Sequence, residues 1–110
     1  MSHSDLGHAL RKRAYFIVTV HIDEPEKRPL YDAYIGRVKP IVERHGGRYL
    51  VRTEEITALS GDSPDRVIVI EFPDQETLKR CFASAEYREI AMLREQAVRA
   101  SAIIVEECES

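Results

Sequence analysis

The sequence predicts a protein of the α+β class, with strands and helical segments in the order β-α-β-β-α-β. Four runs rich in β-branched and aromatic residues are typical of strands. Between them, two longer segments carry apolar residues at helical spacing. With 110 residues, of which 44% are hydrophobic and 32% charged, the chain has the size and composition of one globular domain.

The first half of the chain predicts a strand followed by one long helix. Residues 15–22 (YFIVTVHI) form the expected first strand. The helix is expected to start near Pro29, because proline is favoured in a first turn. It should end at His45, because Gly46-Gly47 is typical of a left-handed C-terminal cap. Pro40 lies inside this segment, so we expect one continuous helix with a local bend.

The second half predicts three strands and two shorter helices. The strands are expected at residues 48–53, 66–72 and 101–106, with residues 56–59 as a candidate extension of the first of these past a bulge. Asp74 and Ser84 are both favourable N-cap residues, which predicts two successive helices between the last two strands.

This order of elements is that of the ferredoxin-like βαββαβ fold, which has a four-stranded antiparallel sheet. We expect a flexible N-terminal segment at residues 1–14, a single domain at residues 15–107 and a short tail at residues 108–110. The N-terminus lacks the apolar core of a signal peptide, and no run is long enough to span a membrane. A cytoplasmic location is therefore expected.

Charge and cysteine content argue against several classes of function. The net charge is −3 and basic residues are interleaved with acidic ones, so we expect no nucleic-acid partner. Cys81 and Cys108 form no CxxC pattern, and the histidines have no metal-ligand spacing. We therefore expect neither a disulfide framework nor a bound metal or cofactor.

The predicted sheet has apolar residues on both faces. In the first strand Phe16 and Val18 alternate with Tyr15 and Ile17, and residues 66–72 show a similar pattern. Right-handed crossovers place both helical segments on one face, so the second apolar face needs another cover. The simplest cover is a second copy related by a twofold axis, which predicts a homodimer. The alternatives are a monomer with a tolerated apolar face or a face covered by the N-terminal segment.

Polar residues on apolar stripes are the candidates for function. His45 ends the core-facing stripe of the first helix, and Glu71 ends the third strand among apolar residues. Antiparallel pairing should bring His45, Arg48 and Glu71 to one end of the sheet and leave His21 at the other. A histidine and a carboxylate in a cleft suit proton transfer. The alternative is that both residues are structural: the helix dipole would stabilise His45, and Glu71 would belong to an ion pair.

The leading hypothesis is a small-molecule enzyme that performs proton transfer, isomerisation or oxygenation in a cleft without a cofactor. His45 and Glu71 would be its acid–base pair. The expected ligand-binding residues are Tyr34, Arg48, Arg52 and His21. The alternative is a non-catalytic module for ligand binding or dimerisation. Arg94 is expected to be a snorkelling or ion-paired side chain, and Cys81 a small buried residue.

Three stretches of the sequence resemble the domain of unknown function 1330 family: HGGRYLVR at residues 45–52, RVIVIEFP at residues 66–73 and SAEY at residues 84–87. The resemblance covers about residues 15–107 and implies a dimeric α+β barrel. That superfamily includes cofactor-free monooxygenases, lactone isomerases and haem-degrading enzymes, so the resemblance implies a fold and no single activity. Cys81 stands where the family commonly has an aromatic residue.

Overall fold

The computed structural model describes residues 12–108. Along the chain they form β1 (Ala14–His21), a 3-10 turn η1 (Pro25–Lys27), α2 (Arg28–Arg44), β2 (Arg48–Thr53), β3 (Arg66–Phe72), α3 (Gln75–Ala83), α4 (Ala85–Ala97) and β4 (Arg99–Glu106). The expected flexible segment lies outside the described residues except for residues 12–14, of which the last begins β1. None of the helices in this part of the chain is long and apolar enough to cross a membrane.

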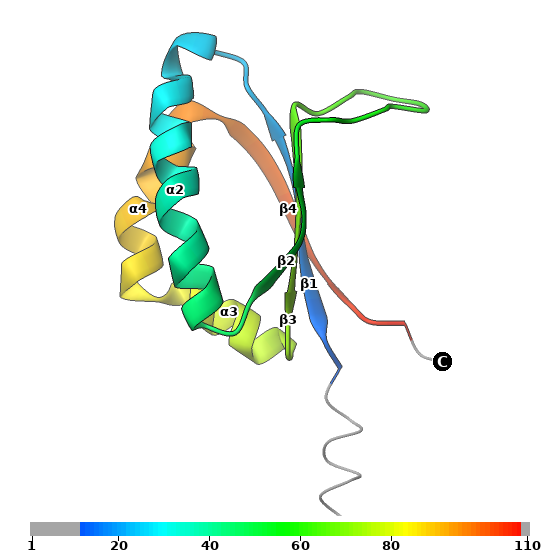
Figure 1. Cartoon of the computed structure of the whole chain (residues 1–110), viewed down its shortest axis with the longest axis vertical. Coiled ribbons are helices and arrows are strands. Elements are labelled where there is room, and N and C mark those ends of the chain that lie inside the picture. Colours follow the sequence, from blue (N-terminus) through cyan, green and yellow to red (C-terminus); the bar gives the residue numbers. More distant parts are fainter. Residues whose placement is uncertain (1–11, 109–110) are drawn as a thin grey trace, which may run out of the picture.

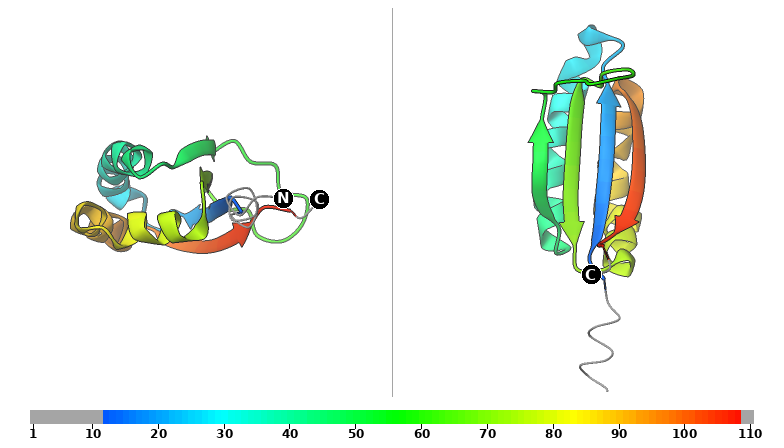
Figure 2. Two further views of the ribbon diagram at one scale, coloured as in Figure 1. Left: turned by 90° about the horizontal axis from the view of Figure 1, so that it is seen from below. Right: turned by 90° about the vertical axis from the view of Figure 1, so that its right-hand side faces the viewer.

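The four strands form one antiparallel sheet in the order β2-β3-β1-β4. The helices α2, α3 and α4 lie on one face of this sheet, with α2 behind β2 and β3 and α4 behind β4 (Figure 1, Figure 2). This confirms the ferredoxin-like fold. The connection between β2 and β3, residues 54–65, projects from one end of the sheet away from the helices (Figure 1). Residues 56–59 belong to this connection and form no strand, and the irregularity in β2 lies earlier, between Tyr49 and Val51.

Short polar side chains fix the starts of the two later helices. Asp74 caps α3, because its carboxylate accepts a hydrogen bond from the Thr77 backbone N–H at 2.7 Å. Ser84 caps α4, because its hydroxyl accepts from the Tyr87 backbone N–H at 3.3 Å. Both predicted N-caps are confirmed, and Ser84 also marks the corner at which the chain turns from α3 into α4.

Two glycines end α2 for different physical reasons. The helix runs without interruption through Pro40. Gly46 then adopts a φ of 88°, the left-handed conformation of a C-terminal cap. At Gly47 the need is space, because a Cβ there would lie 2.4 Å from Val42 Cγ1 and 2.9 Å from Phe72 Cζ. The backbone between α2 and β2 therefore packs so closely against the core at Gly47 that no side chain fits there.

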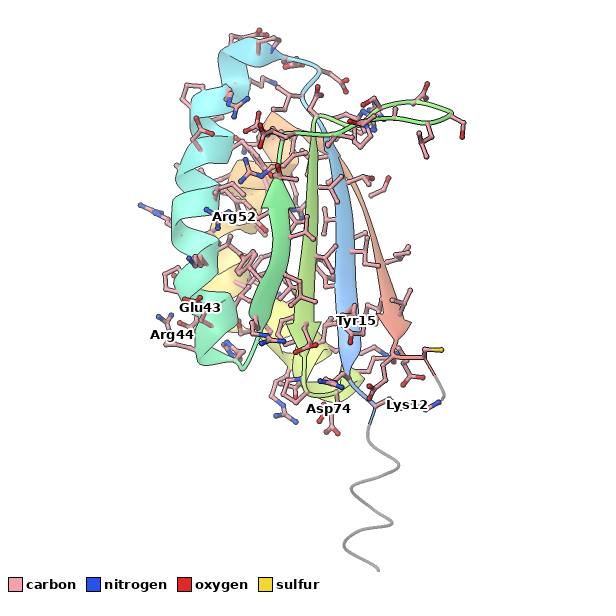
Figure 3. All side chains as sticks on the ribbon, turned by 45° about the vertical axis from the view of Figure 1, so that its right-hand side comes forward. Lys12, Tyr15, Glu43, Arg44, Arg52 and Asp74 are labelled. Atoms are coloured by element: carbon pink, nitrogen blue, oxygen red, sulfur yellow. The ribbon has the colours of Figure 1, made fainter. Side chains whose placement is uncertain are left out.

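The hydrophobic core fills the space between the helices and one face of the sheet. Val20 and Phe72 from the strands are buried there with Tyr31, Val42 and Leu78 from the helices. The other face of the sheet, which we call the outer face, also carries a row of apolar side chains: Tyr15, Ile17, Val51, Val67, Val69, Ile103 and Val105. Figure 3 shows Tyr15 on this face. Ile103 is 58% exposed, so the sheet is apolar on both faces but covered by helices on one.

Candidate functional site

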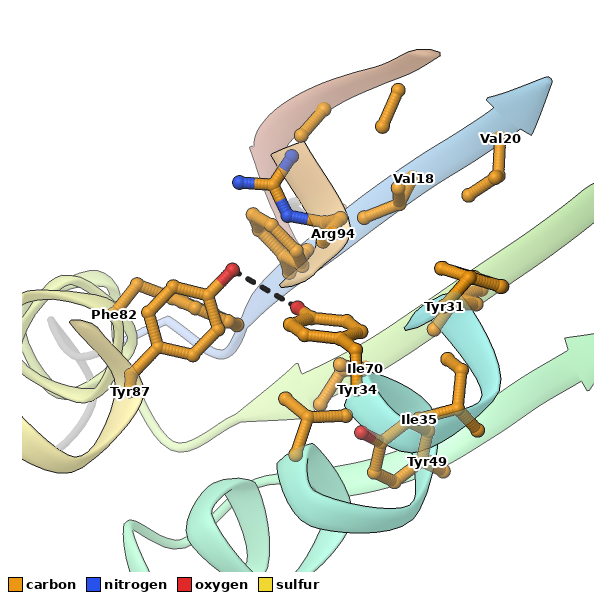
Figure 4. A pocket seen from close by; sticks show the side chains of 15 residues that line it. Val18, Val20, Tyr31, Tyr34, Ile35, Tyr49, Ile70, Phe82, Tyr87 and Arg94 are labelled. Atoms are coloured by element: carbon orange, nitrogen blue, oxygen red, sulfur yellow. Dashed lines mark hydrogen bonds between the residues drawn. The ribbon is translucent and has the colours of Figure 1, made fainter. Parts of the chain in front are cut away.

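A pocket of about 120 Å³ lies between the helices and the core side of the sheet (Figure 4). Helices α2 and α4 form two of its walls, and strand residues form its floor. Its lining comprises Phe16, Val18, Val20, Tyr31, Tyr34, Ile35, Val38, Tyr49, Ile68, Ile70, Phe82, Tyr87, Arg94, Ala100 and Ala102. A mostly apolar concave lining with a few polar groups is typical of small-molecule sites.

Five rings of the lining contact one another in a chain, which we call the aromatic cluster: Tyr31, Tyr34, Tyr87, Phe82 and Phe16. Phe16 and Phe82 stack with their centroids 4.3 Å apart, and Phe82 meets Tyr87 edge to face at 4.9 Å. Tyr34 lies 6.2 Å from Tyr87 and 6.0 Å from Tyr31 between ring centroids. Because each ring is held by its neighbours, the cluster gives the pocket a preformed aromatic surface.

Two tyrosines of the cluster join α2 to α4 through their hydroxyl groups. Tyr34 Oη and Tyr87 Oη lie 2.9 Å apart, and both side chains are buried (Figure 4). Burial raises the pKa of Tyr34 far above its usual value, and the interaction with Tyr87 raises it further, so Tyr34 is a neutral phenol near pH 7. The Tyr31 hydroxyl, in contrast, is buried without a hydrogen-bond partner. The Tyr34–Tyr87 pair keeps one hydroxyl proton that its internal hydrogen bond does not use, which an oxygen of a ligand can accept.

Arg94 is the one charged residue among the lining side chains that the structure describes. Figure 4 shows its guanidinium on the same side of the pocket as the Tyr34–Tyr87 hydroxyl pair. Burial lowers the pKa of Arg94, but Tyr87 and Tyr34 outweigh this effect and raise it above its usual value, so the side chain is cationic. Glu95 is 3.7 Å from the guanidinium and 62% exposed, whereas the Arg94 side chain is 27% exposed. Water therefore screens this ion pair.

Three residues named from the sequence can be placed directly. Tyr34 lines the pocket. Arg48 and Glu71 meet at one end of the sheet, where Arg48 Nη2 donates to Glu71 Oε1 at 3.1 Å. Arg13 also approaches Glu71, at 4.0 Å. Because Glu71 alternates along β3 with the buried Phe72, its carboxylate lies on the outer face and not in the pocket.

His45 reaches the same end of the molecule but has different partners. Its Nδ1 lies 2.9 Å from the Ile41 carbonyl oxygen, and its Nε2 lies 3.9 Å from Glu86 Oε1 on α4. Among residues 12–108 no hydrogen bond or ion pair joins His45 to Glu71, and neither residue lines the pocket. Their assignment as an acid–base pair stays a prediction.

Arg52 and His21 lie outside the pocket lining. The Arg52 guanidinium lies 5.3 Å from the ring centroid of Tyr49, which does line the pocket. Figure 3 shows Arg52 on the side of β2 nearer α2. Burial raises the pKa of Tyr49 to about 12. His21 pairs with Arg99 at the end of the sheet opposite Glu71, as expected. In the described part of the chain no three His, Cys, Asp or Glu side chains are grouped so that they could hold a metal ion.

The sequence reasoning did not assign Tyr87 and Arg94 to the site. A signal for them exists, because a spacing of seven residues places both on one face of α4. That spacing does not show which side chain Tyr87 contacts across the pocket. The contact is with Tyr34, which lies 53 residues before Tyr87 in the chain.

The model of the family described as Domain of unknown function (DUF1330) matches residues 13–108. The chain belongs to this family. The family resemblance of the sequence is thus confirmed over nearly the whole described structure. No curated protein matches the chain.

Solved structures share the fold at low sequence identity. A protein of unknown function from Rhodopseudomonas palustris is 19% identical with a TM-score of 0.75, and the alignment covers 100% of this chain and 96% of that one. SnoaB, a cofactor-independent oxygenase from Streptomyces nogalater, is 15% identical with a TM-score of 0.60 and coverages of 90% and 96%. A dimeric ferredoxin-like protein of unknown function from Thermobifida fusca is 9% identical with a TM-score of 0.66 and coverages of 89% and 93%. At these identities the likeness shows the fold alone.

Proposed function

We propose that this protein binds a small, largely apolar molecule in the pocket and acts on it as a cofactor-free enzyme. The observation that carries the proposal is the meeting of the aromatic cluster, Arg94 and the Tyr34–Tyr87 hydroxyl pair in one pocket. A cation and neutral phenols in apolar surroundings stabilise negative charge on a substrate oxygen. Such charge develops when a proton is removed beside a carbonyl, the step that proton transfer, isomerisation and cofactor-free oxygenation share. That SnoaB is a cofactor-independent oxygenase of the same fold supports the last of these.

The second candidate is a module that binds the same ligand without changing it. It is favoured by the lining itself, which includes no carboxylate and no imidazole among the described residues. An enzyme would therefore need a base from outside the lining or a substrate that ionises readily. His45 and Glu71 lie outside this lining, and Glu71 is on the outer face, so as the proposed acid–base pair they would serve a site other than this pocket.

One experiment separates these two functions. The purified protein is incubated with a mixture of small metabolites, and the mixture is analysed by mass spectrometry before and after, together with dioxygen consumption. An enzyme converts the compound that it binds, whereas a binding module releases it unaltered. Arg94→Met should abolish retention of the compound, while Arg88→Met, an exposed arginine on the same helix, should not. Retention that is equal in both variants would show that Arg94 does not hold the compound.

The acid–base assignment has its own test. If His45 and Glu71 act in catalysis, His45→Ala and Glu71→Gln should abolish turnover while the melting temperature stays nearly unchanged. A fall in melting temperature with turnover intact would instead show that the contacts of Glu71 with Arg48 and Arg13, and of His45 with Ile41, are structural.

We also propose that the protein is a homodimer that pairs through the outer face. The proposal is supported by the row of apolar side chains on that face and by the dimeric ferredoxin-like neighbour from Thermobifida fusca. Val69 lies centrally, paired with Ile17 on β1 and Val51 on β2. In sedimentation at micromolar concentration the native chain should be dimeric, and Val69→Asp should be monomeric. Ala33→Asp, which places the same charge on the exposed side of α2, should remain dimeric.

A further inference from the structure

The size of the pocket limits its ligand. Its volume is about 120 Å³, and an apolar protein cavity of roughly 150 Å³ accepts a benzene molecule. The pocket is therefore no larger than a cavity for a single ring. Phe16, Phe82 and Tyr87 line this space and pack against one another in stacked and edge-to-face pairs. An aromatic lining of this kind favours a flat aromatic ring over a branched aliphatic group.

The charge of the pocket limits the ligand further. Arg94 supplies a full positive charge, and the described lining contains no carboxylate to neutralise it. Its neighbour Glu95 is 62% exposed and lies at 3.7 Å, which makes it a weak competitor for a ligand anion. The Arg94 side chain itself is only 27% exposed, so a contact with it is partly shielded from water. A guanidinium in such a position is well suited to bind a carboxylate through paired hydrogen bonds.

We propose that the pocket selects a compact aromatic anion: a single ring that carries a carboxylate or an ionised enol or phenol oxygen. The ring lies against the aromatic cluster, and the anionic oxygen lies on the Arg94 guanidinium beside the Tyr34–Tyr87 hydroxyl pair. This inference rests on the proposed small-molecule site and names its ligand class. This ligand class excludes aromatic amines, which would bring a second cation next to Arg94, and fused-ring systems, which exceed the pocket volume of about 120 Å³.

Benzoate is the simplest probe of this class, and benzamide is its neutral counterpart of the same shape. Binding of each to the full-length protein is measured by titration, with chemical shifts in a 15N-labelled sample to locate it. We expect benzoate to bind at least tenfold more tightly than benzamide or benzylamine, since a charge-assisted contact of this kind corresponds to roughly a tenfold effect or more. Anthracene-9-carboxylate, which has the same charge and three fused rings, should bind at least tenfold more weakly than benzoate.

Substitutions in α4 test whether Arg94 causes the preference for benzoate. Arg94→Met keeps the apolar stem of the side chain. It should weaken the binding of benzoate by roughly tenfold or more and leave the binding of benzamide unchanged. Arg94→Lys should recover part of the loss, because it keeps the charge without the forked geometry. Arg88→Met, which removes an exposed charge from the same helix, should change benzoate binding less than twofold. Melting curves confirm that each variant is folded.

The outcomes separate this inference from the proposed function. If benzamide binds as tightly as benzoate at the same residues, the small-molecule site stands and the preference for an anion is overturned. If Arg94→Met and Arg88→Met have the same effect on benzoate, the assignment to Arg94 is overturned. If none of the probes shifts resonances of the aromatic cluster, both the inference and the proposed site fail.

Discussion

Two tyrosines one helical turn apart on α2 should respond in opposite directions to the same substitution. Tyr31 and Tyr34 both line the pocket, and both rings belong to the aromatic cluster. The Tyr34 hydroxyl is hydrogen-bonded to that of Tyr87, whereas the Tyr31 hydroxyl is buried without a partner. Replacement by phenylalanine keeps each ring and removes only the hydroxyl. The difference between the two variants therefore measures the hydrogen bond, separated from ring packing.

The expected change in the free energy of unfolding follows from the surroundings of each hydroxyl. Tyr34→Phe removes one buried hydrogen bond and leaves the Tyr87 hydroxyl, in a residue that is 8% exposed, without that partner. Together these effects should lower the free energy of unfolding by about 1.5–2 kcal/mol. Tyr31→Phe removes a buried hydroxyl that makes no hydrogen bond, so it should raise the free energy of unfolding by up to about 1 kcal/mol. The two variants should thus differ by about 1.5–3 kcal/mol, or roughly 6–12 °C in melting temperature.

Urea denaturation followed by circular dichroism, at one protein concentration for all samples, measures this difference. Equal concentration matters because the stability of a dimer depends on it. Equal stability of the two variants within about 0.5 kcal/mol, the usual scatter of surface substitutions, would refute the reasoning. The double variant with Tyr34→Phe and Tyr87→Phe completes the cycle and should cost less than the sum of the two single changes, because it leaves no hydroxyl unpaired.

Three further predictions concern the framework around the pocket. Gly47→Ala should destabilise the fold by about 3 kcal/mol, because its Cβ would lie 2.4 Å from a buried methyl group. Gly36→Ala, whose Cβ would meet nothing within 4 Å, should raise the free energy of unfolding by about 0.5–1 kcal/mol. Urea denaturation measures both changes, and equal effects of the two substitutions would contradict the close approach at Gly47. Burial raises the pKa of the Cys81 thiol to about 11, so a maleimide at pH 8 should label the exposed Cys108 and reach Cys81 only after denaturation; mass spectrometry after digestion distinguishes the two. Asp74→Ala should cost about 1 kcal/mol through loss of the α3 cap, whereas Asp74→Asn should retain most of the stability.

The sequence could predict most of the fold because its signals are local. The strand at residues 66–72 is a continuous run of β-branched and apolar residues, and the structure has β3 at the same bounds. Asp74 and Ser84 were recognised as N-caps because a short oxygen-bearing side chain can satisfy the first free N–H groups of a helix. The antiparallel sheet and the single helical face then followed from connection rules.

The site was less predictable because it depends on which way side chains turn. The position of Glu71 at one end of the sheet, near Arg48, was predictable, but the register that pairs it with Arg48 was not. His45 stands where α2 ends, so its ring orientation is set by the local turn, and its Nδ1 lies against the Ile41 carbonyl oxygen. Arg94 could be placed on an apolar stripe of α4 but not in one pocket with Tyr34, since that requires the relative position of two helices. Helix packing of this kind has no signal in local spacing.

The pocket and the outer face lie on opposite sides of the same sheet. In a dimer that pairs through the outer face, each pocket would be built entirely from one chain, and two sheets would separate the two pockets. Neither ligand would then contact a residue shared with the other site. Binding should follow a simple hyperbolic isotherm with one ligand per chain and a Hill coefficient near one. Dimerisation would thus stabilise the chain without making the two sites cooperative.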